Sequence, residues 1–301
     1  MVTTVSRPPV RAPTVPAEPR RRRTGWRRAL VVHLPLVLLC LIWLVPTVAL
    51  FVSSFRTSAD ASSTAWWRAA QPPLRFTEQN YVAVLTTGGM GRAFANSLLI
   101  TVPSVSLMVS LGAVTGYVLA RMRFRGSRLV FVLLLGLAIV PLQTILVTVL
   151  RLYNDLDLTG TWPGIWLVHA GVALPFVTYL LHNFFRALPR EMFEAAEIDG
   201  ADPVACFVRV ALPTSVPALA SVVIFQFLWV WNDLLLALIF LGGDERVAPL
   251  TVTLSGLTNT ITGQGWNLLT AAAFVSLVCP LLVFFGLQRY FVHGLLAGSV
   301  K

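Results

Sequence analysis

The chain has 301 residues, of which 56% are hydrophobic and 12% are charged, and its net charge is +10. Ordinary soluble domains carry about 25% charged residues. The composition therefore excludes an ordinary soluble domain and indicates a membrane protein.

Residues 1–29 are predicted to form a tail outside the membrane. Four consecutive arginines, Arg20–Arg23, lie in a proline-rich segment, a composition typical of disorder and suited to contact with anionic lipid. The apolar run that follows is about 22 residues long, which exceeds a typical signal-peptide core. We therefore interpret it as an uncleaved first membrane span.

Six apolar stretches are long enough to cross a bilayer, which takes about 20 residues in a helix. Backbone facing lipid must satisfy its own hydrogen bonds, so these stretches are expected to be helices. They are Leu30–Val52, Ser97–Ala120, Leu129–Leu150, Pro163–Phe185, Ala218–Leu241 and Leu268–Leu287.

The distribution of basic residues predicts the orientation of these spans. The two ends of the chain and the second–third and fourth–fifth connections hold 17 basic residues, and the three opposite loops hold 6. The more basic side faces the cytoplasm, so both termini are predicted to be cytoplasmic. This asymmetry explains most of the positive charge without a nucleic-acid ligand.

The connection between the fourth and fifth spans, residues 186–215, is the most informative segment. Pro189 suits a helix start, and Glu191 and Glu194 lie near the positive end of that helix dipole. Gly200 can end the helix in a left-handed cap, and Asp202 before Pro203 can begin another helix. The pattern predicts two short helices with a sharp turn on the cytoplasmic face.

Glu194-Ala195-Ala196, then Gly200, then Val210 and Leu212-Pro213 resemble the EAA loop of bacterial ABC importer permeases, EAA-x3-G-x9-I-x-L-P. The one departure is Val210, where isoleucine is usual. We call residues 186–215 the EAA-like loop. A plain re-entry loop is the alternative, but it leaves the compact acidic turn without a role.

Other segments resemble the carbohydrate-uptake members of that family. They are Asn96-Ser97, Trp231-Asn232-Asp233 with Gly242-Gly243, and the ending Gln288–Lys301. The likeness is greatest to the second permease subunit of the maltose and α-glucoside type. It covers about residues 30–301.

The resemblance implies an all-α membrane protein with the type I ABC importer permease fold. Residues 30–289 would form the permease domain and residues 290–301 a cytoplasmic C-terminal tail. The chain would be a non-catalytic subunit in the bacterial plasma membrane, binding no cofactor or metal itself. ATP and Mg²⁺ would belong to a partner ATPase dimer.

The further partners implied are a second homologous permease, an extracytoplasmic solute-binding protein and membrane lipid, with no nucleic acid. The external loop 242–267 is either in contact with the binding protein or only solvated. The resemblance assigns ATPase coupling to Glu194, Ala195, Ala196, Asp199, Gly200, Val210, Leu212 and Pro213.

Polar side chains within spans are costly and usually face a cavity or a partner. Candidates for the translocation path are Gln226, Trp231, Asn232 and Asp233. Asp233 is predicted to lie inside the fifth span, where it either lines the path or hydrogen-bonds to a neighbouring helix. His169 and His182 are predicted to be interface or packing residues.

Two other classes are less consistent with the sequence. A secondary transporter would use mid-membrane carboxylates and leave the EAA-like loop without a role. An intramembrane hydrolase would need a nucleophile–base pair or a metal motif, and the chain has neither H-E-x-x-H nor G-x-S-x-G nor a Walker A motif. Its three cysteines show no metal-ligand spacing.

Overall fold

The computed structural model describes residues 26–86, 89–257 and 265–297. These residues form helices and turns, and their only β pairing is an isolated bridge between Arg56 and Phe76. The chain divides into two compact units, residues 1–48 and 49–301. The all-helical prediction is confirmed for the described residues.

The first unit contains most of helix α1, Trp26–Ser54. Its apolar side chains from Leu30 to Val45 are at least half exposed, as expected for a helix whose solvent is lipid. Pro35 and Pro46 lie within α1 without ending it. Of the predicted tail, residues 1–25 lie outside the described residues, and residues 26–29 begin α1.

The segment after α1 folds into short helices, α2 (Ser58–Ser63), η1 (Trp66–Ala70) and α3 (Gln79–Thr86). Arg56 is buried, and its guanidinium donates to the backbone oxygens of Asp60 and Thr64. The Asn80 amide donates to the backbone oxygens of Ser54 and Arg56, and its oxygen accepts from Asn267 at 2.7 Å. These bonds satisfy polar groups that the segment would otherwise bury at a cost.

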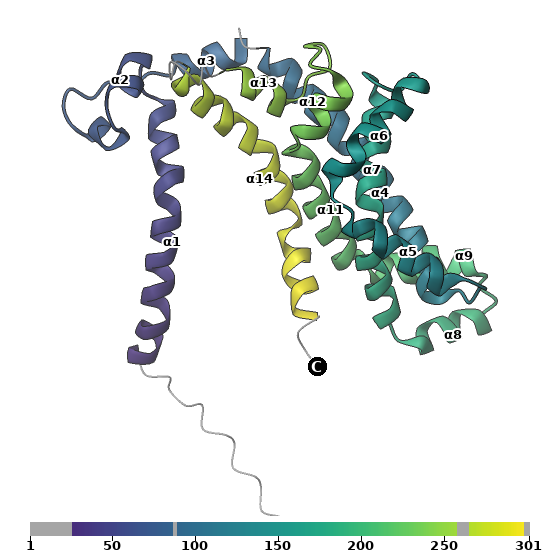
Figure 1. Ribbon diagram of the computed structural model, residues 1–301. Coiled ribbons are helices and arrows are strands. Elements are labelled where there is room, and N and C mark those ends of the chain that lie inside the picture. Colours follow the sequence, from purple (N-terminus) through teal and green to yellow (C-terminus); the bar gives the residue numbers. More distant parts are fainter. Residues whose placement is uncertain (1–25, 87–88, 258–264, 298–301) are drawn as a thin grey trace, which may run out of the picture. The chain divides into compact units, whose positions relative to one another are not determined.

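Helices α4 (Met90–Arg121) and α7 (Trp162–Ala187) pack against each other in the second unit (Figure 1). Two glycines of α4, Gly112 and Gly116, lie directly against α7, which is the close approach that small residues permit. A Cβ on Gly112 would collide with Val177, and one on Gly116 would lie 2.9 Å from the backbone nitrogen of His182.

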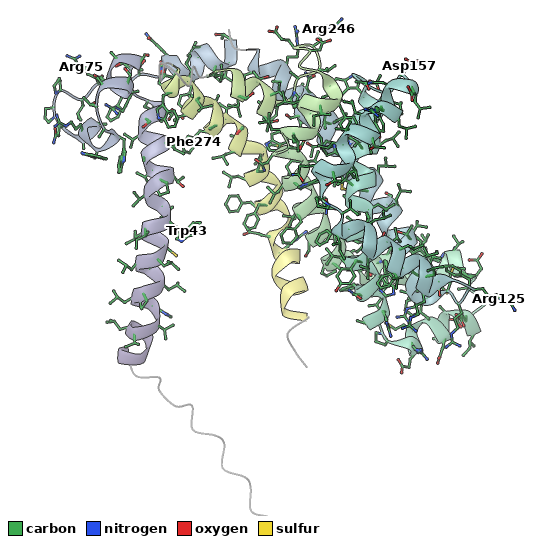
Figure 2. All side chains as sticks on the ribbon, in the orientation of Figure 1. Trp43, Arg75, Arg125, Asp157, Arg246 and Phe274 are labelled. Carbon is green, nitrogen blue, oxygen red and sulfur yellow. The ribbon has the colours of Figure 1, made fainter. Side chains whose placement is uncertain are left out.

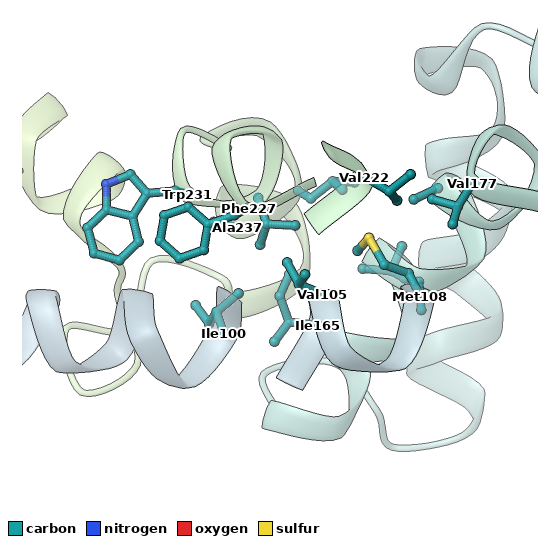
Figure 3. Close-up of a cluster of buried hydrophobic side chains, with 14 of the residues drawn as sticks. Ile100, Val105, Met108, Ile165, Val177, Val222, Phe227, Trp231 and Ala237 are labelled. Carbon is teal, nitrogen blue, oxygen red and sulfur yellow. The ribbon is translucent and has the colours of Figure 1, made fainter. Parts of the chain in front are cut away.

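Helices α11 (Val216–Trp231) and α14 (Trp266–Ala297) complete the bundle. Figure 3 shows part of the buried cluster, to which α4 contributes Met108, α7 contributes Ile165 and α11 contributes Phe227 and Trp231. The Trp231 indole stacks on Phe227 and donates to the backbone oxygen of Ser276 at 3.2 Å. Helix α14 extends to Ala297, through much of the segment predicted as the C-terminal tail.

Two of the predicted spans are not continuous helices. Residues 129–150 divide into α5 (Ser127–Ile139) and α6 (Leu142–Asp155), which differ in direction by 102°. Pro141 lies at the break, where its missing N–H removes one hydrogen bond that a continuous helix would make. The predicted span 218–241 also breaks after Trp231 and resumes as α12, Leu235–Leu241.

The remaining helices are α8 (Arg190–Ile198), α9 (Pro203–Cys206), the π segment η2 (Phe207–Ala211), α10 (Leu212–Thr214) and α13 (Leu250–Gly256). The segment from Pro203 to Thr214 is bent by 76° from α11. Among the described residues, four helices are long and apolar enough to span a membrane, or up to six if each bent pair is one span. The predicted six spans equal the upper count in number, but the second bent pair joins Pro203–Thr214 to α11, whereas the predicted fifth span was 218–241.

Gly116→Ala should destabilise the α4–α7 contact, because the new methyl group meets backbone that cannot rotate away. Overpacking of this kind costs about 1–3 kcal/mol. Thermal unfolding of the purified chain would show a lowered midpoint. Gly136→Ala on α5 is the matched control, since its Cβ would meet nothing within 4 Å; equal loss in both variants would contradict the packing argument.

Candidate functional site

The two segments with predicted contacts to other proteins lie at opposite ends of the second unit (Figure 1). Helices α8 and α9, within the EAA-like loop, lie at one end near the start of α5. Helix α12, which precedes the 242–267 loop, and α13, which lies within it, are at the other end. Figure 2 shows the same separation, with Arg125 near α8 and α9 and Arg246 near α12.

The EAA-like loop forms the expected pair of short helices. Gly200 has a φ of +88° and its N–H bonds to the Glu197 carbonyl at 3.0 Å, so α8 ends in a left-handed turn. The Asp202 carboxylate then accepts from the N–H of Ala205 at 2.6 Å, which caps α9. Pro189 stands immediately before α8.

The inner side of the EAA-like loop is attached to α4 and α7 through aromatic rings. Phe193 of α8 and Phe207 of η2 both contact Tyr117 of α4. The Arg121 guanidinium lies 4.1 Å from the Phe193 ring centroid and donates to the backbone oxygen of Phe185 at 2.7 Å. A cation over a ring and hydrogen bonds to carbonyls at a helix end both stabilise this joint.

The outer side of the EAA-like loop exposes apolar side chains next to acidic ones. Ile198 is 86% exposed and Val204 is 67% exposed. Of the eight predicted coupling residues, five are exposed and three are half-buried. The exposed ones are Glu194, Ala195, Asp199, Gly200 and Pro213, and the half-buried ones are Ala196, Val210 and Leu212.

Sequence reasoning did not select Ile198 or Val204 for this surface. Ile198 and Val204 both fall in variable positions of the EAA pattern. The signal that could have identified Ile198 is a large apolar residue directly before an acidic residue and a turn glycine.

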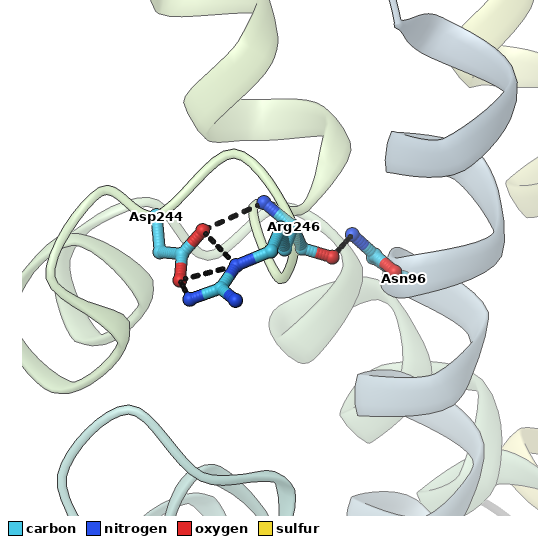
Figure 4. A network of polar contacts seen from close by, with 3 residues as sticks. All are labelled: Asn96, Asp244 and Arg246. Carbon is cyan, nitrogen blue, oxygen red and sulfur yellow. Dashed lines mark hydrogen bonds and ion pairs between the residues drawn. The ribbon is translucent and has the colours of Figure 1, made fainter.

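At the opposite end, the start of the 242–267 loop is attached to α4. The Asn96 amide donates to the backbone oxygens of Arg246 and Ala248, both at 3.0 Å, and Ser97 Oγ accepts from the N–H of Leu250 at 2.8 Å. Figure 4 shows Asn96 beside the exposed Asp244–Arg246 ion pair. Hydrogen bonding from the Arg246 side chain lowers the pKa of the Asp244 carboxyl below its ordinary value.

Asp233 lies in the break between α11 and α12, which corrects the prediction that it is inside a continuous helix. Its carboxylate accepts from the N–H groups of Leu236 and Ala237 at 3.2 and 3.0 Å. These are unpaired donors at the start of α12, and a capping carboxylate satisfies them. One of its oxygens also lies 3.5 Å from Nε2 of His169.

The four candidate path residues lie in different surroundings. Trp231 is buried in the core, and the exposed Asn232 donates to the backbone oxygen of Leu228. Gln226 lines a groove between α7 and α11 with a cavity volume of about 470 Å³, together with Phe176, Phe225 and Trp229. Among the described residues, no three His, Cys, Asp or Glu side chains could together hold a metal ion.

Comparison with known proteins identifies the family. Residues 97–296 match the family described as "binding-protein-dependent transport system inner membrane component". The chain belongs to this family. The matched residues run from the second turn of α4 almost to the end of α14, so they contain both the EAA-like loop and the 242–267 loop.

Relatives agree with this membership over almost the whole chain. An osmoprotective compounds uptake permease protein of Synechocystis sp. is 48% identical over 93% of this chain and 95% of its own length. An alpha-glucoside transport system permease protein of Rhizobium meliloti is 46% identical over 83% of this chain and 67% of its own. Members of this family are membrane components of transport systems. The chain is therefore a transport subunit and not an enzyme.

A solved structure supports the fold independently of close sequence similarity. A bacterial ABC transporter involved in the import of the acidic polysaccharide alginate superposes with a TM-score of 0.75 at 22% identity. The match covers 91% of this chain and 100% of the other. The expected ABC importer permease fold is therefore confirmed.

Asp202→Ala should loosen the second helix of the EAA-like loop, because α9 would lose its capping carboxylate. Loss of an N-cap costs about 1 kcal/mol, so backbone hydrogen exchange at Ala205 and Cys206 should accelerate roughly fivefold. Asp199→Ala removes a carboxylate of the same loop that does not cap α9 and should leave that exchange unchanged. Equal protection in both variants would contradict the capping assignment.

Proposed function

We propose that this chain is the transmembrane permease subunit of an ATP-driven, binding-protein-dependent ABC importer that carries a sugar. The observation that carries this proposal is the EAA-like loop: a compact helix–turn–helix whose inner side is fixed to α4 and α7, while its outer side exposes Ile198 and Val204. We interpret these two exposed apolar side chains, beside a defined turn, as part of a contact surface for a partner protein.

The EAA-like loop would transmit closure of an ATPase dimer to the membrane helices. A push on α8 acts on Phe193, which contacts Tyr117 of α4 and lies under Arg121. Arg121 is bonded to the end of α7 through the Phe185 and Leu188 carbonyls. Because side chains at this joint are close-packed, a displacement of the loop moves both helices.

The complete machine would contain a second homologous permease, two ATPase subunits and an extracytoplasmic solute-binding protein. ATP and Mg²⁺ would be bound by the ATPase, and this chain would hold no cofactor. The complex would reside in the bacterial plasma membrane with both termini of this chain in the cytoplasm. The 242–267 loop, at the end opposite α8, would then face the binding protein.

A sugar as the solute is supported by the relatives and by one groove. The two relatives named above take up osmoprotective compounds and alpha-glucosides. The groove between α7 and α11 combines aromatic rings, Phe176, Phe225 and Trp229, with the amide of Gln226. Aromatic faces with a few hydrogen-bonding groups suit a sugar ring, and an α-glucoside such as maltose or trehalose is the specific proposal.

Gly200→Val should abolish coupling, because a β-branched residue resists the φ of +88° at this turn. We expect the ATPase to be lost on purification of the complex and uptake to fall at least about tenfold, the equivalent of 1.4 kcal/mol. Gly126→Val is the matched control, since Gly126 has a φ of +89° in the α4–α5 turn outside the EAA-like loop. Normal ATPase retention and uptake in Gly200→Val would refute the coupling role.

Uptake of labelled maltose and trehalose should depend on this chain in cells that carry the complete system. Glycerol phosphate, a monosaccharide and a peptide serve as controls. Dependence of one α-glucoside on the chain supports the proposed solute. Dependence of glycerol phosphate instead would retain the permease function and reject the α-glucoside.

A further inference from the structure

His169 of α7 has one ring nitrogen whose role is fixed by its partner. Nδ1 lies 2.9 Å from the backbone oxygen of Ile165, and a carbonyl can only accept, so Nδ1 carries a proton. In a neutral imidazole, Nε2 is then an acceptor. His169 is 1% exposed, and Nε2 has no hydrogen-bond partner among the described residues.

The group facing Nε2 is itself an acceptor. Oδ2 of Asp233 lies 3.5 Å away, longer than the 2.7–3.2 Å of an N–H···O hydrogen bond. The Asp233 carboxylate already accepts from two N–H groups at the start of α12. Two buried acceptors at this separation need a donor placed beside both.

A small cavity borders both groups. Its volume is about 10 Å³, close to the space that one water needs. Its polar lining residues are His169, Asp233, Ser97 and Thr101, and its other lining residues are Ile100, Val230, Ala237 and Pro249. Ser97 Oγ accepts from the Leu250 N–H, which leaves its own proton to donate. Apart from Asp233 and His169, no lining residue is titratable.

We propose that this cavity is a binding site for a single buried water, which donates to Nε2 of His169 and to the Asp233 carboxylate and accepts from a hydroxyl of α4. Water is the ligand that fits the volume and supplies two donors to two acceptors. The site joins α4, α7 and the break between α11 and α12.

The same site holds the base of the 242–267 loop. The Thr251 hydroxyl donates to the backbone oxygen of Asp233, and the Leu250 N–H donates to Ser97. His169 is therefore a positioning residue: through the water it fixes Asp233, and through Asp233 it fixes the loop. This consequence rests on the proposed function, in which the loop meets the binding protein, whereas the water site itself does not.

The first test is a cryo-EM map of the assembled importer at a resolution that shows ordered water, with histidine ¹⁵N NMR of the same complex at pH 7. The expected result is density between His169 and Asp233 and an unprotonated Nε2. The result that overturns the proposal is a doubly protonated His169 ring bonded directly to Asp233 with no density between them. The His169 signal is assigned by its loss in His169→Gln.

The second test compares His169→Phe with His182→Phe, a matched change at another buried histidine of α7. We expect the water density to disappear only in His169→Phe. The concentration of binding protein that half-saturates ATP hydrolysis should rise at least about threefold in that variant alone, roughly 0.7 kcal/mol. An equal rise in both variants would overturn the positioning role, and hydrolysis independent of binding protein would overturn the proposed function while leaving the water site standing.

Discussion

Gly112 and Gly116 allow α4 to lie so close to α7 that any added side chain would meet backbone or the base of a valine. Between lipid-solvated helices there is little hydrophobic driving force, so association depends on close packing and on hydrogen bonds. The Thr115–Thr178 hydroxyl pair at 2.7 Å adds such a bond beside the glycines. Helix α11, the EAA-like loop and the start of the 242–267 loop all contact this helix pair.

The two segments predicted to contact other proteins are both attached to α4. Arg121, at the end of α4, is bonded to the end of α7 and covers Phe193 of α8. Asn96 and Ser97, near the other end of α4, are bonded to the backbone of residues 246–250. A motion of α4 would therefore displace the EAA-like loop and the described start of the 242–267 loop together, as the proposed coupling between an ATPase and a binding protein requires.

At the breaks in the helices, backbone N–H groups are either missing, because the residue is proline, or hydrogen-bonded to a side chain. Pro141 removes a donor at the α5–α6 break, and Asp233 supplies an acceptor for the first donors of α12. Irregular backbone at membrane depth persists only where protein or water satisfies it. A polar cluster lies beside the break between α11 and α12, where Asp233 caps the start of α12. It consists of His169, Asp233, Ser97 and Thr101.

The sequence by itself determined the membrane class, the number of apolar stretches and the turn chemistry of the EAA-like loop. These depend on local properties: residue hydrophobicity, the conformational freedom of Gly200 and the capping ability of Asp202. The family likewise follows from residue types at fixed offsets along the chain.

Only the tertiary structure decided where the continuous stretches break and which polar residues meet. Asp233 and His169 are 64 positions apart in the sequence, and their proximity depends on how α11 and α12 pack against α7. Trp231 was a candidate for the path and is buried in the core, whereas Ile198 was passed over and is almost fully exposed. Burial is a property of the packed helices, because hydrophobicity alone does not distinguish a side chain facing the core from one facing lipid or a partner.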